Sequence, residues 1–435
     1  MLSRRELLRA GTLGGLVVAA PGVFVGCSDG GGPKPKPGDN GIRLVSSDVA
    51  RDAADPAVIG AGAESVLALG AGLYGQLVGG TGNLAVSPYS AAVALAMTVN
   101  GAVGATRDEM LAVLAAADTA SLDDGLNALT SYVESLAGPV PHVKDAEIAL
   151  ASANQLFGQA GFDWQKPFLD ALARSFGAGL REVDYEGAAD AARAAVNGWT
   201  ADQTHDRIPE IIPSGAIDAT TRLVLVNALY FKAPWAVPFE PDATTDDEFH
   251  LGDGSTVSVP TMHGGAGYGE GDGWRAAHLT YAGDTLAMTV VLPDEGREDD
   301  LDALVAGGGL DSLLEVQGSE VDLSLPRWKF LVGESLNDAL NGLGMTTAFD
   351  AQAADFSAMT TDDQLVVGNV LQQVFIAVDE AGTEAAAATA VVMDVTSAPA
   401  EPPEPLVVDR PFLFVIHDVQ HGTPLFLGKV VDPRS

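Results

Sequence analysis

The chain has 435 residues, of which 47% are hydrophobic, and its 59 acidic against 23 basic side chains give a formal net charge of −36. This charge excludes electrostatic attraction to nucleic acid or to an anionic membrane surface, and it argues against a basic patch for sulfated polysaccharides. The apolar content suffices for a large core, and the length alone predicts two or three domains at ~150 residues each.

Residues 1–27 have the pattern of an export signal. The run from Ser3 to Arg9 resembles a twin-arginine motif, and the apolar run from Leu13 to Ala20 is too short to span a bilayer. Cys27 is the only cysteine, so it cannot form an internal disulfide, and Gly26-Cys27 resembles a bacterial lipobox, in which the thiol is acylated. We therefore expect an exported protein that is lipid-anchored at the cell envelope or surface through Cys27. Cleavage near Ala20 or Cys27 that leaves a free thiol, and hence an extracellular protein, is the alternative.

Residues 28–55 are predicted to form a flexible tether, because the stretch from Gly30 to Gly38 is rich in glycine and proline. Beyond it, apolar residues recur at the spacing of one helix face: Val66, Leu69, Leu73 and Leu77. The G-x-G-x-x-G pattern from Gly70 to Gly75 falls inside this helix and does not follow a strand, so it predicts no nucleotide site.

The most informative segment lies near the C-terminus. The strand-like run from Val374 to Val378 precedes a segment from Glu380 to Thr389 that is dominated by alanine and threonine. An extended chain from Thr383 to Ala390 would present only small side chains on its inward face and could enter a sheet without steric clash. An alanine-rich loop or a short helix is the alternative, since alanine is the best helix former. A proline-rich stretch, 398–405, and a second strand-like run, 410–416, follow.

The sequence resembles the serpin family in about ten blocks that follow the family's order from roughly Pro56 to Pro433. The signature is the run from Val374 to Glu384, continued by the hinge to Thr389 and by the closing run from Arg410 to Pro433. Further blocks are distributed along the chain: Asn83 to Ser90, Ala153 to Phe157, Val183 to Tyr185, Asn197 to Trp199, Leu223 to Lys232, Val259 to Met262, Val291 to Glu295 and Ala354 to Ser357.

The resemblance implies one α+β domain over residues 56–435, in place of two or three domains. The implied serpin fold has a central mixed β-sheet with additional sheets, about nine helices and an exposed reactive loop at about residues 380–409. It further implies a monomeric endopeptidase inhibitor, not an enzyme, which needs no cofactor and no metal. The expected partner is a serine protease, or in some cases a cysteine protease, and the expected membrane contact is through the lipid anchor only.

In this family the protease cleaves the reactive loop as a single-use substrate, and the cleaved loop inserts into the central sheet as an extra strand. Small side chains at the inward positions and the absence of proline between Glu380 and Ala398 permit such insertion here. A serpin-fold surface protein that binds a partner without inhibiting a protease is the alternative. The resemblance assigns the hinge to Glu380, Gly382, Thr383, Glu384, Ala385, Ala386, Ala387, Ala388 and Thr389.

The cleaved bond is predicted to be Thr396–Ser397, by the family's usual count from Glu380. Counting back from Arg410 places it near Ala400–Glu401, so the bond is confined only to the range from Met393 to Glu401. A small β-branched residue such as Thr396 suits the shallow pocket of an elastase-like or subtilisin-like protease. No lysine or arginine occurs from Glu380 to Asp409 that would suit a trypsin-like one.

The resemblance also implies a polar cluster beneath the central sheet that controls its opening. Its predicted members are Ser87, Ser90, Asn227 and Gln372, with Trp235 at the point where the loop first inserts. Gln372 stands where the family frequently has histidine, and a glutamine keeps a donor and an acceptor without a titratable group. Core packing and the satisfaction of buried polar groups are the alternative role of these residues.

Overall fold

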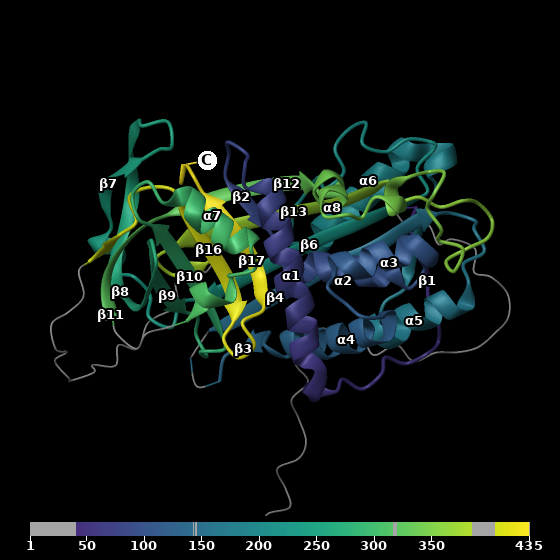
Figure 1. Ribbon diagram of the computed structural model, residues 1–435, viewed down its shortest axis with the longest axis horizontal. Coiled ribbons are helices and arrows are strands. Elements are labelled where there is room, and N and C mark those ends of the chain that lie inside the picture. The colour runs from purple at the N-terminus through teal and green to yellow at the C-terminus, as the bar shows by residue number, and fades with distance from the viewer. Residues whose placement is uncertain (1–40, 142, 144–145, 316–319, 385–404, 435) are drawn as a thin grey trace, which may run out of the picture. The chain divides into compact units, whose positions relative to one another are not determined.

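Two β-sheets form the framework of the protein, which the computed structural model describes for residues 41–141, 143, 146–315, 320–384 and 405–434 (Figure 1). The first sheet is mixed, because β4 and β5 pair in parallel, as do β6 and β13, whereas its other pairs are antiparallel. Its order is β1-β5-β4-β6-β14-β13-β12, with β3 beside β4. These strands are β1 (Arg43–Val45), β3 (Gly138–Pro139), β4 (Glu147–Gln159), β5 (Leu180–Val183), β6 (Leu223–Pro234), β12 (Trp328–Ser335), β13 (Asn369–Asp379) and β14 (Gly382–Thr383).

The second sheet has nine strands in the order β15-β11-β8-β9-β10-β16-β17-β2, with β7 beside β8. The additional sheets expected from the sequence are thus one continuous sheet, because the long β8 pairs along its length with β7, β11 and β9. The strands are β2 (Leu84–Val86), β7 (Thr245–His250), β8 (Thr256–Gly271), β9 (Trp274–Thr280), β10 (Leu286–Pro293), β11 (Glu320–Pro326), β15 (Leu406–Val407), β16 (Phe412–Asp418) and β17 (Pro424–Val430).

The described residues contain eight α-helices, against about nine expected, and four short 3-10 helices. With the two sheets they give the predicted α+β class. The α-helices are α1 (Ile59–Leu77), α2 (Pro88–Val99), α3 (Gly104–Val113), α4 (Thr119–Ser135), α5 (Lys166–Phe176), α6 (Tyr185–Gln203), α7 (Glu298–Ala306) and α8 (Asn337–Gly342). The 3-10 helices are η1 (Pro56–Val58), η2 (Pro241–Ala243), η3 (Asp311–Leu314) and η4 (Thr347–Phe349).

Strand β6 separates two apolar cores, and helices cover both faces of the first sheet. Leu225 and Leu229 belong to the main core, whereas Val224 and Val226 pack with residues of α6. The split follows from the strand itself, whose successive side chains point to opposite faces. Figure 1 shows α6 on one side of this sheet and α2, α3, α4 and α5 on the other. A strand buried on both faces has no polar face, which explains the continuous apolar run at the start of β6.

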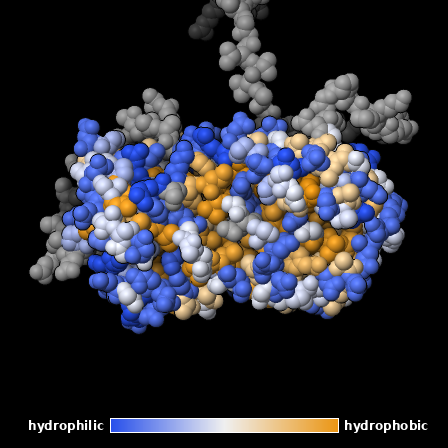
Figure 2. Space-filling view, turned by 90° about the horizontal axis from the view of Figure 1, so that it is seen from above, coloured by the Kyte–Doolittle hydropathy of each residue, from blue (hydrophilic) through white to orange (hydrophobic). Residues whose placement is uncertain are grey.

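The face that carries α6 is drawn from above in Figure 2. Apolar areas lie toward the middle of this face, and hydrophilic residues surround them. Leu331 of β12 is among the large apolar side chains that remain exposed. Side chains on this face of the first sheet are therefore shielded from solvent less completely than side chains in a fully covered core.

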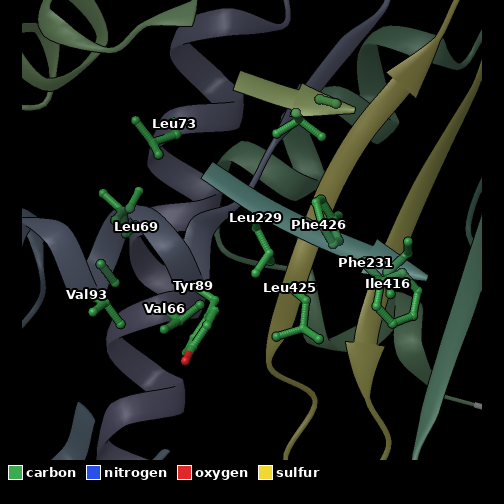
Figure 3. Close-up of a cluster of buried hydrophobic side chains, with 14 of the residues drawn as sticks. Val66, Leu69, Leu73, Tyr89, Val93, Leu229, Phe231, Ile416, Leu425 and Phe426 are labelled. Carbon is green, nitrogen blue, oxygen red and sulfur yellow. The ribbon is translucent and has the colours of Figure 1, made fainter. Parts of the chain in front are cut away.

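Helix α1 confirms the helix predicted from apolar spacing. Val66, Leu69 and Leu73 have no exposed surface, and Figure 3 shows them on one helix among the side chains of α2, β6, β16 and β17. The glycines of the G-x-G-x-x-G pattern serve packing. A Cβ at Gly72 would lie 2.9 Å from the Leu343 side chain, and one at Gly75 would lie 2.9 Å from that of Ala306.

The segment before α1 differs from the tether predicted over 28–55. Arg43–Val45 pairs with β5 at the edge of the first sheet. Ser47 Oγ donates a hydrogen bond of 2.5 Å to Asp170, and the backbone N–H of Asp52 donates one of 2.9 Å to the carbonyl of Arg174. The folded domain therefore already includes these residues before Pro56. The sequence gives little sign of β1, because this strand has three residues and is mostly exposed.

Two histidines are buried on β9 and β16, the strands that flank β10 in the second sheet. His278 Nδ1 on β9 and His417 Nε2 on β16 lie 2.9 and 3.0 Å from the hydroxyl of Thr289 on β10. Burial, with a contribution from His417, lowers the pKa of His278 to about 4, and burial also lowers the pKa of His417. Two weaker effects oppose these shifts: Asp418, through its backbone carbonyl and its charge, raises the pKa of His417, and the backbone carbonyl of Glu315 raises that of His278. The folded protein thus holds both imidazoles neutral at pH 7.

Acid is expected to destabilise the fold through His278. Its folded-state pKa lies below the unfolded value of 6.5, so the unfolded chain binds the proton more tightly. The corresponding stability is complete above pH 6.5 and is lost as the pH falls through 4. Between pH 7 and pH 4 the free energy of unfolding of a His278→Gln variant should therefore fall by about 2 kcal/mol less than that of the unsubstituted protein. Urea denaturation measures this, with the exposed His250→Gln as the control; identical pH dependence of all three proteins would refute it.

Candidate functional site

The hinge that follows β13 turns back into the first sheet. Gly382 and Thr383 form β14, which lies between the ends of β13 and β6 and is antiparallel to both. Thr383 is opposite Val378 on one side and Ala233 on the other. Further along, β6 and β13 pair directly with each other, from Asn369 to Val374 of β13. The two strands thus separate at one end of the sheet, and the first residues of the hinge occupy the opening.

The side chain of Thr383 points into the protein. It is only 1% exposed, and its hydroxyl lies 2.6 Å from the hydroxyl of Tyr281. The ring of Tyr281 stacks on Trp235 with 4.6 Å between ring centroids and 14° between planes. A larger residue than threonine would meet the fully buried tyrosine, so the site requires a small side chain at this inward position.

Trp235 and its neighbours hold the backbone of the hinge. The indole N–H of Trp235 donates to the carbonyl of Asp379 at 2.9 Å, and its backbone N–H donates to the carbonyl of Ala381 at 3.0 Å. The backbone N–H of Phe239 donates to the carbonyl of Glu380 at 2.9 Å. Three donors from one segment therefore fix three consecutive carbonyls at the start of the reactive loop.

Each of the two hinge glutamates is held by an arginine. Glu380 accepts hydrogen bonds from Thr244 Oγ1 at 2.7 Å and from Arg327 at 3.3 Å. Glu384 forms an ion pair with Arg207, which lies in the segment between α6 and β6. The sequence reasoning found the two glutamates and missed their partners. Arg207 is 177 residues away from Glu384, and nothing in a single sequence joins positions so far apart.

The remaining residues assigned to the hinge, Ala385, Ala386, Ala387, Ala388 and Thr389, lie outside the described residues. So do the predicted bond Thr396–Ser397 and the predicted lipid attachment site Cys27. Of the strand expected from Thr383 to Ala390, only Thr383 and Glu384 are therefore described, and only Thr383 belongs to a strand.

The polar residues predicted beneath the sheet lie together. Gln372 of β13 accepts a hydrogen bond at 2.9 Å from the backbone N–H of Ser87, and its amide donates to the Ser87 carbonyl at 3.0 Å. The same amide donates to Asn227 of β6. Gln372 and Asn227 are opposite each other in the parallel pairing of the two strands. Their contact must therefore break if a further strand is to pass between β13 and β6.

Asn154 of β4 completes this cluster, and sequence reasoning missed it. Its Oδ1 accepts from Asn227 at 2.9 Å and from the hydroxyl of Ser90 at 2.5 Å. The available signal was an amide inside the apolar run of β4. The cluster links three strands to α2, and all five of its side chains are uncharged and lack an ionisable imidazole. Its charge therefore does not change with pH in the range where histidine titrates.

The described residues contain no group of three or more histidine, cysteine, aspartate or glutamate side chains that would hold a metal ion. A cavity of about 730 Å³ is lined by side chains of mixed charge, among them His250, Glu298 and Arg410. None of its lining residues belongs to the hinge or to the polar cluster.

Truncating Gln372 should weaken the sheet at its opening point. A Gln372→Ala variant leaves two backbone groups of Ser87 and the amide oxygen of Asn227 without their buried partner, at a cost of about 2–3 kcal/mol in the free energy of unfolding. Urea denaturation measures the loss, with the exposed Gln352→Ala as the control, for which about 0.5 kcal/mol or less is expected. Equal stability of the two variants would show that the hydrogen bonds of Gln372 contribute nothing to the free energy of unfolding.

The comparisons with known proteins agree over most of the chain. Residues 64–433 match the family described as serpin, serine protease inhibitor. An uncharacterized serpin-like protein of Thermococcus kodakarensis is 34% identical over 368 residues, 83% of this chain and 84% of that protein. Human leukocyte elastase inhibitor is 32% identical over 364 residues, 81% of this chain and 93% of that protein.

Solved structures give the same result. The thermophilic serpin tengpin in its native state is 27% identical, with a TM-score of 0.76, over 89% of this chain and 97% of that chain. An Arabidopsis serpin in its native stressed conformation is 29% identical, also with a TM-score of 0.76, over 86% of this chain and 98% of that chain. The match over most of the sequence shows that the chain has the predicted serpin fold and belongs to the serpin family of protease inhibitors.

Proposed function

We propose that the protein inhibits a serine protease by acting as its suicide substrate. The protease cleaves the reactive loop, and the released N-terminal part of the loop inserts between β6 and β13 while the protease is still attached as an acyl-enzyme. The observation that carries this proposal is the position of β14, which already lies between these two strands before any cleavage.

The pairing of the strands supports insertion along the whole opening. Beyond β14, β6 and β13 pair with each other in parallel over residues 369–374 of β13. An inserted strand that continues β14 would replace this ladder by two antiparallel ones, which are slightly more stable per residue and bring a full set of new main-chain hydrogen bonds. The energy gained by insertion is then available to distort the attached protease.

The proposed target is an elastase-like or subtilisin-like protease, with cleavage at Thr396–Ser397. Thr396 is small and β-branched, and the loop offers no basic residue to a trypsin-like pocket. A relative named leukocyte elastase inhibitor supports the choice of an elastase-like enzyme. A cysteine protease is a second partner class to include in the test.

The decisive experiment is incubation with a panel of elastase-like, subtilisin-like and trypsin-like serine proteases, to which a cysteine protease is added as the second partner class. We expect a complex that survives denaturing gel electrophoresis with the first two classes only. Mass spectrometry of the released peptide identifies the cleaved bond. Cleavage without any complex across the panel would contradict inhibition and favour a serpin-fold binding protein.

A matched pair of variants tests the insertion step. Ala387 is four residues from Thr383 and so on the same inward face of an extended strand, whereas Ala386 is on the opposite face. Ala387→Arg would bury an unpaired guanidinium on insertion and should convert the inhibitor into a substrate, with at least about tenfold less complex. Ala386→Arg should retain most complex formation. Equal amounts of complex from the two variants would exclude insertion in this register.

We also propose that the mature protein begins at Cys27 and is lipid-anchored at the cell envelope or surface. Because the folded domain reaches back to Arg43, the tether has about 15 residues and a root-mean-square span of about 20 Å, which separates the domain from the lipid. Labelled fatty acid should be incorporated into the natural protein and not into a Cys27→Ala variant, which should fractionate as soluble. Absence of label from both forms would leave a freely secreted protein.

A further inference from the structure

A buried carboxylate lies where three helices meet on the same side of the first sheet (Figure 1). Asp123 belongs to α4 and is only 8% exposed. Its Oδ1 accepts a hydrogen bond of 3.0 Å from the side-chain amide of Asn100, the residue that caps the C-terminus of α2. Its Oδ2 accepts one of 3.3 Å from the hydroxyl of Ser175 in α5. Asp123 therefore connects α4 to both neighbouring helices.

Among the described residues, no cationic side chain pairs with this carboxylate. Helix α2 has no charged residue, and the only one in α1, Glu64, is exposed. On α5, Lys166 and Arg174 both act on Asp170. Arg51, from the segment before α1, hydrogen-bonds to other residues of α4. The hydrogen-bond partners at the junction are therefore all neutral.

A buried carboxylate without a counter-charge binds its proton tightly. Burial raises the pKa of Asp123 to about 7, the hydrogen bonds from Asn100 and Ser175 oppose this shift, and the exposed Asp124 adds slightly to it. A neutral carboxyl can donate to the hydroxyl of Ser175, because a hydroxyl accepts as well as donates. Loss of the proton therefore leaves hydrogen-bond partners in place but creates a buried, uncompensated negative charge.

We propose that Asp123 is a pH-sensitive contact whose neutral carboxyl holds the N-terminal half of α4 against α2 and α5, and whose deprotonation loosens this half of the helix. Opening lets water solvate the charge. It also exposes Leu122 and Leu126, which are buried in the main core. The two effects oppose each other, so α4 should open locally while the rest of the fold remains intact.

The direction of the pH dependence follows from the two forms of the helix. In the open form Asp123 ionises at its ordinary pKa of 3.8, whereas in the closed form its pKa is about 7. The stabilisation of the closed form is therefore complete below pH 3.8 and is lost as the pH rises through 7. Within this window the opening equilibrium constant should rise by up to about tenfold per pH unit. His278 acts in the opposite direction and in the second sheet.

Hydrogen exchange of the full-length protein tests this inference. Amide protection is compared at about pH 5 and about pH 7.5, after correction for the intrinsic pH dependence of exchange. Protection of the N-terminal half of α4 should fall by at least about tenfold at the higher pH. Helix α7, which packs on the second sheet, serves as the internal control and should keep its protection.

Two matched substitutions on α4 assign the effect to one carboxyl. Asp123→Asn keeps the shape of the side chain and stays neutral, so α4 should remain protected at both pH values. Asp124→Asn neutralises the exposed neighbour and should retain the pH dependence of the unsubstituted protein. Unchanged protection of α4 in the unsubstituted protein would overturn the proposal. An equal loss of protection in Asp123→Asn, or in α7, would overturn it as well.

Discussion

The contact between β6 and β13 is the constraint on which the rest of the molecule depends. These strands are interior strands of the first sheet and are far apart in sequence, yet they pair directly over only part of their length. At one end they diverge around β14, and near the other end Gln372 and Asn227 join them. Under the proposed function, the protein stays competent to inhibit only while this incomplete ladder remains closed below the hinge.

The two ends of that ladder are held by different kinds of interaction. The polar cluster consists of neutral hydrogen bonds that are sheltered from solvent, so neither salt nor a change of pH near neutrality should weaken it. The hinge is held in part by charge, through Arg207 and Arg327, whose side chains are roughly half exposed. Ionic strength should therefore weaken the charged contacts of the hinge and leave the hydrogen bonds of the polar cluster unchanged.

Sequence reasoning succeeded where a local pattern or a family block has one structural meaning. The spacing of Val66, Leu69 and Leu73 is sufficient to predict a buried helix face, and the family blocks name four of the five members of the polar cluster. It did not find Asn154, Arg207 or the strand β1. Asn154 and Arg207 act through partners that the fold brings together from distant positions, and β1 is too short and too exposed to leave a periodic signal.

The two ends of the reactive loop belong to different sheets. Before the loop the chain forms β14 in the first sheet, and after it the chain forms β15, which pairs in parallel with β11 of the second. The loop is therefore a covalent connection between two sheets that are hydrogen-bonded separately. While the loop is intact, its length limits how many of its residues either sheet can take up as a further strand. Cleavage of a single peptide bond anywhere in the loop removes this covalent connection between the two sheets. A molecule that a protease has cleaved once therefore differs permanently from an intact molecule in the connectivity of its chain.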